Sequence, residues 1–244
     1  MGEMTQVSPW FWFPARRPDA PLRLVCVPYA GGGAGAFRAW PASLPGVEVA
    51  VVRLPGRETR FKETPLRDFD KVLHVLAAEL AALRDRPLAL FGHSLGGLLA
   101  FELARTTSPV QLFVSATRAP HLFSAEPVES LSDAEFIDYL RAFRLLPAAS
   151  SQTDLLRLML PAIRADFAVA ASYVHRPGPP LACPLHAFYG EADPSVARAT
   201  MEPWQERTTG RFTLEPVPGG HFFLHAEERR MLAGIDARLR EHTY

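Results

Sequence analysis

The feature that most constrains how this chain folds is the segment GHSLG at residues 92–96, which directly follows an apolar run at residues 87–91. A further glycine, Gly97, and a helix-forming stretch at residues 98–105 come next. A G-x-S-x-G sequence between a strand and a helix is typical of a nucleophile elbow, a sharp turn that exposes the serine hydroxyl above a sheet. Its glycines are needed because strand and helix approach closely around a strained serine. The segment therefore predicts that Ser94 is a nucleophile.

Apolar strand-like runs alternate with helical patterns along most of the chain. This alternation predicts an α/β fold, with a mostly parallel central sheet and helices on both faces. At 244 residues and 48% hydrophobic content, the chain suits one large domain over residues 1–244. The strands are expected at residues 22–27, 47–54, 87–91, 110–115, 184–189 and 212–217, and the helices at residues 69–84, 95–106, 196–207 and 226–242.

The alternation breaks once, at about residues 119–180, where no convincing strand occurs. Ser132 followed by Glu135 predicts a capping box at the start of one helix. A second helix is expected from about residue 153 to residue 175, and Pro161 should kink or split it. A helical insertion of this kind predicts a lid over the carboxyl ends of the strands, where such sheets bind ligands. The alternative is a second small packing unit without a gating role.

A serine nucleophile needs a histidine base, and the base needs a carboxylate that fixes its tautomer. In this fold the partners follow in the order serine, acid, histidine, on loops after later strands. Asp193 follows the strand expected at residues 184–189, and His221 follows the last expected strand. We therefore predict that Ser94, Asp193 and His221 are catalytic. Glu191 is the fallback acid, expected to face away.

The oxyanion of an acyl-transfer intermediate needs two backbone N–H donors. Leu95 follows the nucleophile at a helix N-terminus, and Ala30 lies in the glycine-rich loop at residues 28–35, after the first core strand. We predict these two as the donors. The competing interpretation is dinucleotide binding, through a relaxed glycine fingerprint at residues 31–36 with Arg53 for a 2′-phosphate. That interpretation leaves the serine, aspartate and histidine without a purpose.

Composition excludes several classes of function. The 26 basic and 26 acidic residues give a formal net charge of zero, which argues against a general nucleic-acid or anionic-membrane binder. No stretch approaches the ~20 apolar residues of a membrane span, and the start of the chain lacks a signal-peptide pattern. Cys26 and Cys183 are expected as two buried thiols rather than a disulfide, which indicates a cytoplasmic protein.

The remaining histidines have weaker claims to a role. His93 neighbours the nucleophile but should point away from it. His225 lies four residues after His221, a zinc-binding spacing on a helix, but Phe222 stands where the H-E-x-x-H motif needs a glutamate. We expect neither a metal nor a cofactor.

As a set, these segments resemble the type II thioesterases that accompany polyketide and non-ribosomal peptide synthesis. The resemblance implies an α/β-hydrolase fold with a helical lid, the triad Ser94, Asp193 and His221, and oxyanion donors at Ala30 and Leu95. It also implies hydrolysis of acyl thioesters on the phosphopantetheine arm of an acyl or peptidyl carrier protein, usually clearing stalled or mis-primed units in antibiotic biosynthesis. The matching pieces are PYAGG at residues 28–32, LPGRE at 54–58, GHSLGG at 92–97, GEAD at 190–193 and GGHFFL at 219–224.

Three alternatives stay open at this point. The same three residues would serve an oxoester hydrolase or an acyltransferase, and a hydrolase scaffold can also carry a non-catalytic binding protein.

The basic cluster of Arg53, Arg57, Arg60 and Lys62 would either receive an acidic carrier protein or form a solvated loop face, which is the simpler interpretation. The sequence carries no signal for acyl length, partner synthase or oligomeric state.

Overall fold

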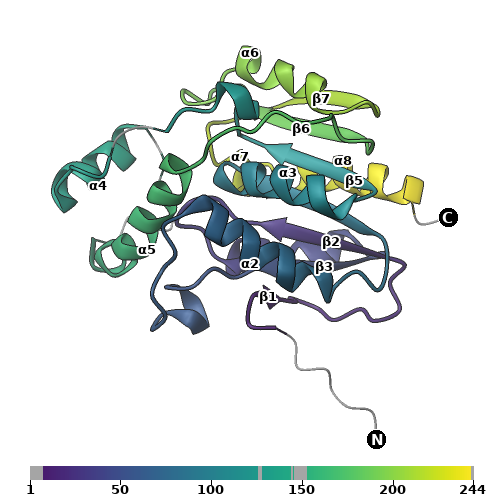
Figure 1. The fold of residues 1–244 in the computed structure, drawn as a ribbon, viewed down its shortest axis with the longest axis horizontal. Helices are drawn as coiled ribbons and strands as arrows, with labels where there is room; N and C mark the ends of the chain where they lie inside the picture. The colour runs from purple at the N-terminus through teal and green to yellow at the C-terminus, as the bar shows by residue number, and fades with distance from the viewer. Residues whose placement is uncertain (1–7, 126–127, 144, 146–152, 243–244) are drawn as a thin grey trace, which may run out of the picture.

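A seven-stranded sheet forms the centre of the molecule in this computed structural model, which describes residues 8–125, 128–143, 145 and 153–242. The strands are β1 (Phe11–Trp12), β2 (Leu22–Val27), β3 (Val47–Val52), β4 (Leu88–His93), β5 (Gln111–Ser115), β6 (Leu185–Gly190) and β7 (Phe212–Val217). Their order across the sheet is β1-β3-β2-β4-β5-β6-β7 (Figure 1). Strands β2 to β7 are parallel, and β1 pairs antiparallel with β3 at one edge.

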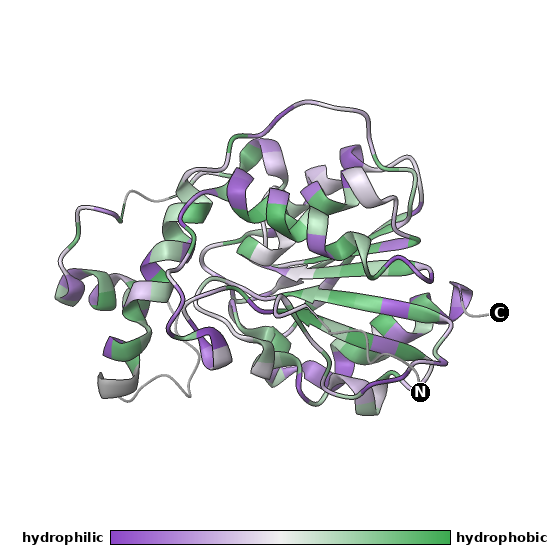
Figure 2. Cartoon of the chain, turned by 60° about the horizontal axis from the view of Figure 1, so that its bottom comes forward, coloured by the Kyte–Doolittle hydropathy of each residue, from purple (hydrophilic) through white to green (hydrophobic). Residues whose placement is uncertain are grey.

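Helices cover both faces of this sheet, as the sequence predicted. The α-helices are α1 (Trp40–Ser43), α2 (Phe69–Ala81), α3 (Leu95–Thr107), α4 (Asp133–Ala142), α5 (Thr153–Ala171), α6 (Arg198–Met201), α7 (Phe223–Ala226) and α8 (Glu228–Leu239). Successive strand side chains point to opposite faces, so Val25 and Val27 pack with α2 and α3 while Leu24 and Cys26 pack with α1 and α8. Figure 2 shows the resulting apolar colouring along the central strands. Both cysteines are buried free thiols, as predicted.

All six predicted strands occur, but some other elements differ from the prediction. The two-residue strand β1 was missed, because a run this short carries no periodicity. The helix expected at residues 196–207 is the four-residue α6 followed by a 3₁₀ segment, Glu202–Arg207. Pro203 stands at the start of that segment, where its missing N–H does not matter. The last expected helix, at residues 226–242, is α8 followed by a short 3₁₀ segment, Arg240–His242, and the four-residue α7 that precedes it was missed.

The helical insertion between β5 and β6 lies at the end of the sheet toward which the strand arrows point (Figure 1). Its helices α4 and α5 share a small apolar cluster that includes Phe136, Leu140, Leu160 and Ile163. The described part of residues 119–180 contains no strand, as expected.

The capping box at the start of α4 is confirmed. The Ser132 N–H donates to Glu135 Oε2 at 2.8 Å, and the Glu135 N–H donates to Ser132 Oγ at 3.4 Å. The expected splitting of the second helix at Pro161 is wrong, since α5 runs through that residue as one helix and ends at Ala171. Burial of Leu160 and Ile163 on either side of the proline holds the helix together despite the lost hydrogen bond.

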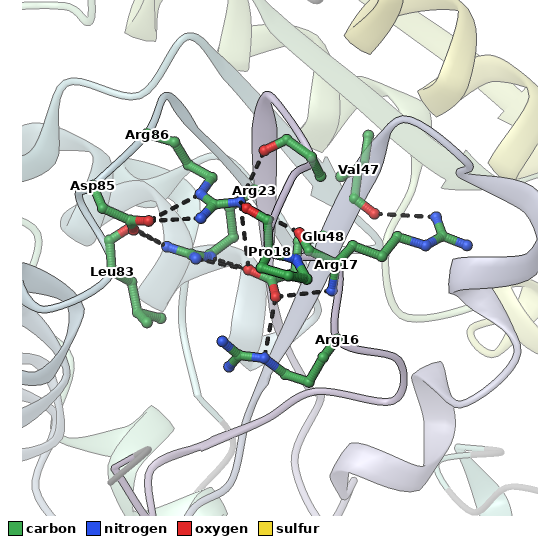
Figure 3. A network of polar contacts seen from close by, with 10 residues as sticks. Arg16, Arg17, Pro18, Arg23, Val47, Glu48, Leu83, Asp85 and Arg86 are labelled. Atoms are coloured by element: carbon green, nitrogen blue, oxygen red, sulfur yellow. Dashed lines mark hydrogen bonds and ion pairs between the residues drawn. The ribbon is translucent and has the colours of Figure 1, made fainter. Parts of the chain in front are cut away.

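An ionic network centred on two buried residues, Arg23 and Glu48, joins the amino ends of β2 and β3 (Figure 3). Glu48 at the start of β3 is fully buried and accepts from Arg23 Nε at 2.9 Å and Arg23 Nη2 at 2.7 Å. Arg23 also contacts Asp85, which Arg86 binds in turn. The network therefore ties β2 and β3 to the loop that precedes β4.

Among the described helices, none is both long and apolar enough to cross a membrane.

Candidate active site

Ser94 occupies the sharp turn between β4 and α3, as the motif predicted. Its backbone has φ +55° and ψ −122°, a strained conformation for a residue with a side chain. A Cβ on Gly92 would lie 2.0 Å from the Gly96 carbonyl oxygen, and a Cβ on Gly96 would lie 2.1 Å from the Val27 carbonyl oxygen. Only glycine fits at both positions, so the two glycines allow the turn and leave the Ser94 side chain partly exposed.

The structure brings Ser94, His221 and Asp193 together from three different loops at the carboxyl ends of the strands. His221 Nε2 lies 3.1 Å from Ser94 Oγ, and His221 Nδ1 lies 2.7 Å from Asp193 Oδ2. The histidine and the aspartate are both buried, with exposed fractions of 5% and 8%. With the Nδ1 proton donated to the carboxylate, the free lone pair of Nε2 faces the serine hydroxyl, which is the arrangement a general base needs.

Ser195 is a further member of this group that the sequence analysis missed. Its N–H and its hydroxyl donate to Asp193 Oδ1 at 2.8 and 2.6 Å, and its Oγ also lies 3.1 Å from His221 Nδ1. Burial raises the pKa of Asp193, but the hydrogen bonds from His221 and Ser195 outweigh burial and hold that pKa below its ordinary value. Asp193 therefore stays ionised. The Asp-Pro-Ser sequence was a recognisable signal, because an aspartate often accepts from the backbone two residues on.

His93 points away from Ser94, as predicted, and supports the backbone of His221. Its Nε2 lies 2.9 Å from the His221 carbonyl oxygen, and its Nδ1 lies 2.9 Å from Ser115 Oγ. Since a carbonyl only accepts, Nε2 carries the proton and Nδ1 accepts from the Ser115 hydroxyl. Burial and the nearby His221 lower the pKa of His93 well below its ordinary value, so this ring is neutral.

The two predicted oxyanion donors are the backbone N–H groups of Ala30 and Leu95. Leu95 is the first residue of α3, so its N–H has no acceptor within the helix. The N–H of Ala30 has no hydrogen-bond acceptor among the described residues. Ala30, Leu95 and Ser94 line one pocket, which is where the two predicted donors would have to act.

That pocket has a volume of about 190 Å³ and is mostly apolar. The insertion contributes five large aromatic and aliphatic side chains to its wall, and Arg118 is the one arginine among the described residues that line it. Arg118 donates to the Ser195 carbonyl oxygen at 2.9 and 3.2 Å. These side chains from the insertion are Phe123, Tyr139, Phe143, Leu145 and Phe167. An apolar wall beside a nucleophile suits an acyl chain.

Two other candidates from the sequence lie outside this group. Glu191 is exposed and turned to solvent, as expected for the fallback acid. His225 binds the Tyr29 hydroxyl at 2.9 Å through Nε2, while both ring nitrogens of His221 are engaged by Ser94 and Asp193. The described residues contain no group of three or more histidine, cysteine or acidic side chains suited to a metal ion.

The interpretation of the basic cluster as a solvated face is wrong for two of its members. Arg57 and Arg60 are both buried, and Arg57 pairs with the buried Asp166 while Arg60 pairs with the exposed Glu63. Lys62 is exposed. The partner of Arg57 lies 109 positions away and is invisible in the sequence, whereas the partner of Arg60 lies only three residues away and was overlooked.

The dinucleotide interpretation also fails. After β2 the glycine-rich loop leads into a 3₁₀ turn, Ala34–Phe37, and not into the long helix whose N-terminus would hold a pyrophosphate. Arg53 is occupied by the Pro9 carbonyl oxygen and by Thr59 Oγ1.

Comparisons with known proteins show the family to which this chain belongs. The Thioesterase domain family model matches residues 22–239. Gramicidin S biosynthesis protein GrsT from Aneurinibacillus migulanus is 39% identical over 97% of this chain and 96% of its own length. Thioesterase PikA5 from Streptomyces venezuelae is 39% identical over 91% of this chain and 82% of its own.

Solved structures extend the similarity to the fold. The type II thioesterase BorB from the borrelidin biosynthetic cluster superposes with a TM-score of 0.88 at 38% identity, covering 94% of this chain and 97% of BorB. The thioesterase RedJ from the prodiginine pathway of Streptomyces coelicolor gives a TM-score of 0.84 at 39% identity, covering 90% of this chain and 91% of RedJ. The chain therefore belongs to the thioesterase family, has its α/β-hydrolase fold, and resembles the type II thioesterases of polyketide and non-ribosomal peptide synthesis.

Proposed function

We propose that this enzyme hydrolyses acyl thioesters from the phosphopantetheine arm of acyl or peptidyl carrier proteins, clearing stalled or mis-primed units in polyketide or non-ribosomal peptide synthesis. The observation that carries the proposal is the 3.1 Å contact between Ser94 Oγ and His221 Nε2 at the wall of an apolar pocket. The named pathways of the similar proteins, gramicidin S and borrelidin synthesis, support the carrier-bound substrate.

In the first half of the reaction, His221 Nε2 takes the Ser94 proton while Oγ attacks the thioester carbonyl carbon. The resulting oxyanion accepts hydrogen bonds from the N–H groups of Ala30 and Leu95, a contribution of about 10²–10³ in rate per donor. The ionised Asp193 stabilises the imidazolium that forms. The C–S bond then breaks, and the pantetheine sulfur leaves with the proton of His221.

In the second half, His221 takes a proton from water, and the hydroxide oxygen attacks the acyl-serine carbonyl. The same two N–H groups bind the oxyanion again. The ester bond to Ser94 breaks, Oγ regains its proton from His221, and the free acid departs. A thiolate leaves more readily than an amine, so this chemistry depends on the nucleophile and the oxyanion donors more than on a strong leaving-group acid.

We further propose that residues 1–244 act as one hydrolase domain in which the insertion is a lid. Support comes from the walls that Tyr139, Phe143 and Phe167 contribute to the pocket. A lid of this kind would exclude water from the acyl chain and admit the pantetheine arm at its edge. The free buried thiols of Cys26 and Cys183 suit a reducing cytoplasm, where we place the protein.

The test is mass spectrometry of an acylated carrier protein before and after addition of wild-type enzyme, Ser94→Ala or Ser124→Ala. Ser124 lines the same pocket and is the matched control. We expect wild type and Ser124→Ala to return the free pantetheine thiol and Ser94→Ala to leave the acyl group in place. Equal turnover by Ser94→Ala contradicts the assignment of the nucleophile.

A parallel assay on matched oxoesters separates the thioesterase from an oxoester hydrolase, and added alcohol acceptors detect an acyltransferase. A strong oxoester preference, or transfer in place of hydrolysis, overturns the proposed reaction. A fluorophosphonate probe should label Ser94 in the folded protein, and absence of labelling would favour a non-catalytic binding protein.

A further inference from the structure

A buried carboxylate on α5 binds the loop that carries Ala30. Asp166 Oδ2 accepts the Gly31 N–H at 2.6 Å. The Arg57 guanidinium donates two hydrogen bonds of 2.7 Å to the same carboxylate, and its Nη1 also donates to the Gly32 carbonyl oxygen at 2.9 Å. One aspartate and one arginine thus hold the two residues that follow Ala30.

The local backbone shows what these contacts fix. The Gly32 N–H closes a turn on the Tyr29 carbonyl oxygen at 2.8 Å, with Ala30 and Gly31 at its centre. Gly31 has φ +75°, which is typical of the third residue of a type II turn. Its N–H belongs to the peptide plane next to Ala30, so the bond to Asp166 orients that plane.

Packing by the same helix supports this contact. A Cβ on Gly31 would lie 2.8 Å from Ile163 Cγ1, so Ile163 covers the turn directly. Ile163 and Asp166 are three residues apart on α5 and therefore share one helix face. The insertion thus touches the turn with an apolar side chain and a carboxylate at once.

The ion pair between Arg57 and Asp166 is buried, and it fixes the positions of the groups that it joins. Only 10% of the Arg57 side chain and 3% of the Asp166 side chain are exposed. Removing such charges from water costs much of their attraction, so the pair is a weak source of stability. Its bidentate form leaves little freedom for either group.

We propose that Asp166, held by Arg57, is a positioning residue for the reaction: it sets the direction of the Ala30 N–H, and it makes that direction depend on the seating of α5. The inference rests on the proposed function of Ala30 as an oxyanion donor. Asp166 touches no reacting atom and acts through the Gly31 peptide. Separate chain segments at residues 28–35, 57 and 166 therefore act as one unit.

The experiment compares wild type, Asp166→Asn, Arg57→Lys and the double variant on a short acyl thioester of pantetheine. One amide oxygen cannot accept all three donors that now bind the carboxylate, and a lysine cannot hold both carboxylate oxygens. Each single variant is expected to lower kcat by about 10- to 100-fold, part of the effect of losing a whole donor, with KM within about threefold. The double variant should lose little more than either single variant.

An alkyl boronic acid, which forms a tetrahedral adduct on Ser94, supplies a readout that a merely structural role would not move. Its affinity should fall in parallel with kcat. The matched control is Asp133→Asn. It removes an exposed carboxylate of α4 that lies 2.9 Å from Arg164 of α5, the helix that also carries Asp166. This variant should leave kcat and boronate affinity within about twofold of wild type.

Folded Asp166→Asn with wild-type kcat overturns the inference, as does a fall in kcat without weaker boronate binding, or a rise in KM alone. An equal loss in Asp133→Asn also overturns it, because the insertion in general would then be responsible. If Asp166→Asn does not fold, Arg57→Lys decides by the same criteria. If the wild-type enzyme hydrolyses no thioester, that result contradicts the proposed function and not the role of Asp166.

Discussion

The substitution Asp193→Asn tests the proposed roles of the acid and the base together, because the structure dictates how the new amide must sit. Ser195 presents two donors, its N–H and its hydroxyl, to Asp193 Oδ1. The amide oxygen must therefore take the Oδ1 position, which places the amide NH₂ toward His221 Nδ1. Since NH₂ only donates, Nδ1 must accept, and the ring proton moves to Nε2. The nitrogen that faces Ser94 then carries a proton and cannot take another.

The expected loss in kcat is about 10⁴-fold, as for the wrong histidine tautomer in other serine triads, which corresponds to about 5.5 kcal/mol. Steady-state hydrolysis of an acyl-pantetheine thioester measures the loss, and nitrogen NMR of His221 reports which ring nitrogen is protonated. Glu191→Gln, an exposed carboxylate two residues away, is the control and should keep wild-type kcat. Activity of Asp193→Asn within tenfold of wild type, with Nε2 unprotonated, would refute the reasoning.

Backbone fit, ion pairing and acid stability can be tested separately. Gly96→Ala should prevent folding, because its Cβ would lie 2.1 Å from a backbone oxygen. Gly46→Ala is the control, since a Cβ at Gly46 meets nothing within 4 Å. Circular dichroism compares the two variants, and a native spectrum for Gly96→Ala contradicts the elbow geometry. Glu48→Ala leaves the buried Nε and Nη2 donors of Arg23 without their acceptor and should cost about 3–5 kcal/mol, or about 6–20 °C in Tm. A loss below about 1 kcal/mol by calorimetry would count against a structural role for the network. Because the folded pKa of Asp193 lies below its ordinary value, its ionised form contributes stability above about pH 3.9 and loses it as the pH falls through the folded pKa. The difference in unfolding free energy between wild type and Asp193→Asn should therefore shrink below about pH 4 in denaturant titrations, and a growing difference is incompatible with this sign.

Sequence patterns predicted the parts of the molecule that depend on local chemistry. The strand runs, the elbow glycines and the capping box at Ser132 all depend on neighbours within a few residues. The approach of Asp193 and His221 to Ser94 was predictable because parallel strands present their carboxyl ends at one edge of a sheet.

What the sequence did not predict depends on contacts between distant residues. Arg57 and Asp166 are 109 positions apart, and neither carries a local pattern that names the other. For this reason Arg57 looked like part of a solvated basic face, whereas Glu63, three residues after Arg60, was a local partner that the sequence analysis overlooked. Ser195 was overlooked although the spacing from Asp193 signalled a turn. Strand β1 has two residues, and only its pairing with Val51 and Val52 defines it.

Strain at the carboxyl ends of the strands explains how a site built on loops is held in place. Ser94 and Ala116 have φ +55° and +48°, conformations that cost about 1–3 kcal/mol each and persist only where the surroundings impose them. Both residues directly follow a strand, and each N–H still bonds across the sheet, Ser94 to the Ser115 carbonyl oxygen at 2.8 Å and Ala116 to that of Phe188 at 3.0 Å. The sheet therefore extends its hydrogen bonding one residue into each turn and forces the strained conformation. The Gly31 turn lacks such a strand neighbour, so its geometry depends on α5 through Asp166, and the donor side of the site is the part that the insertion can alter.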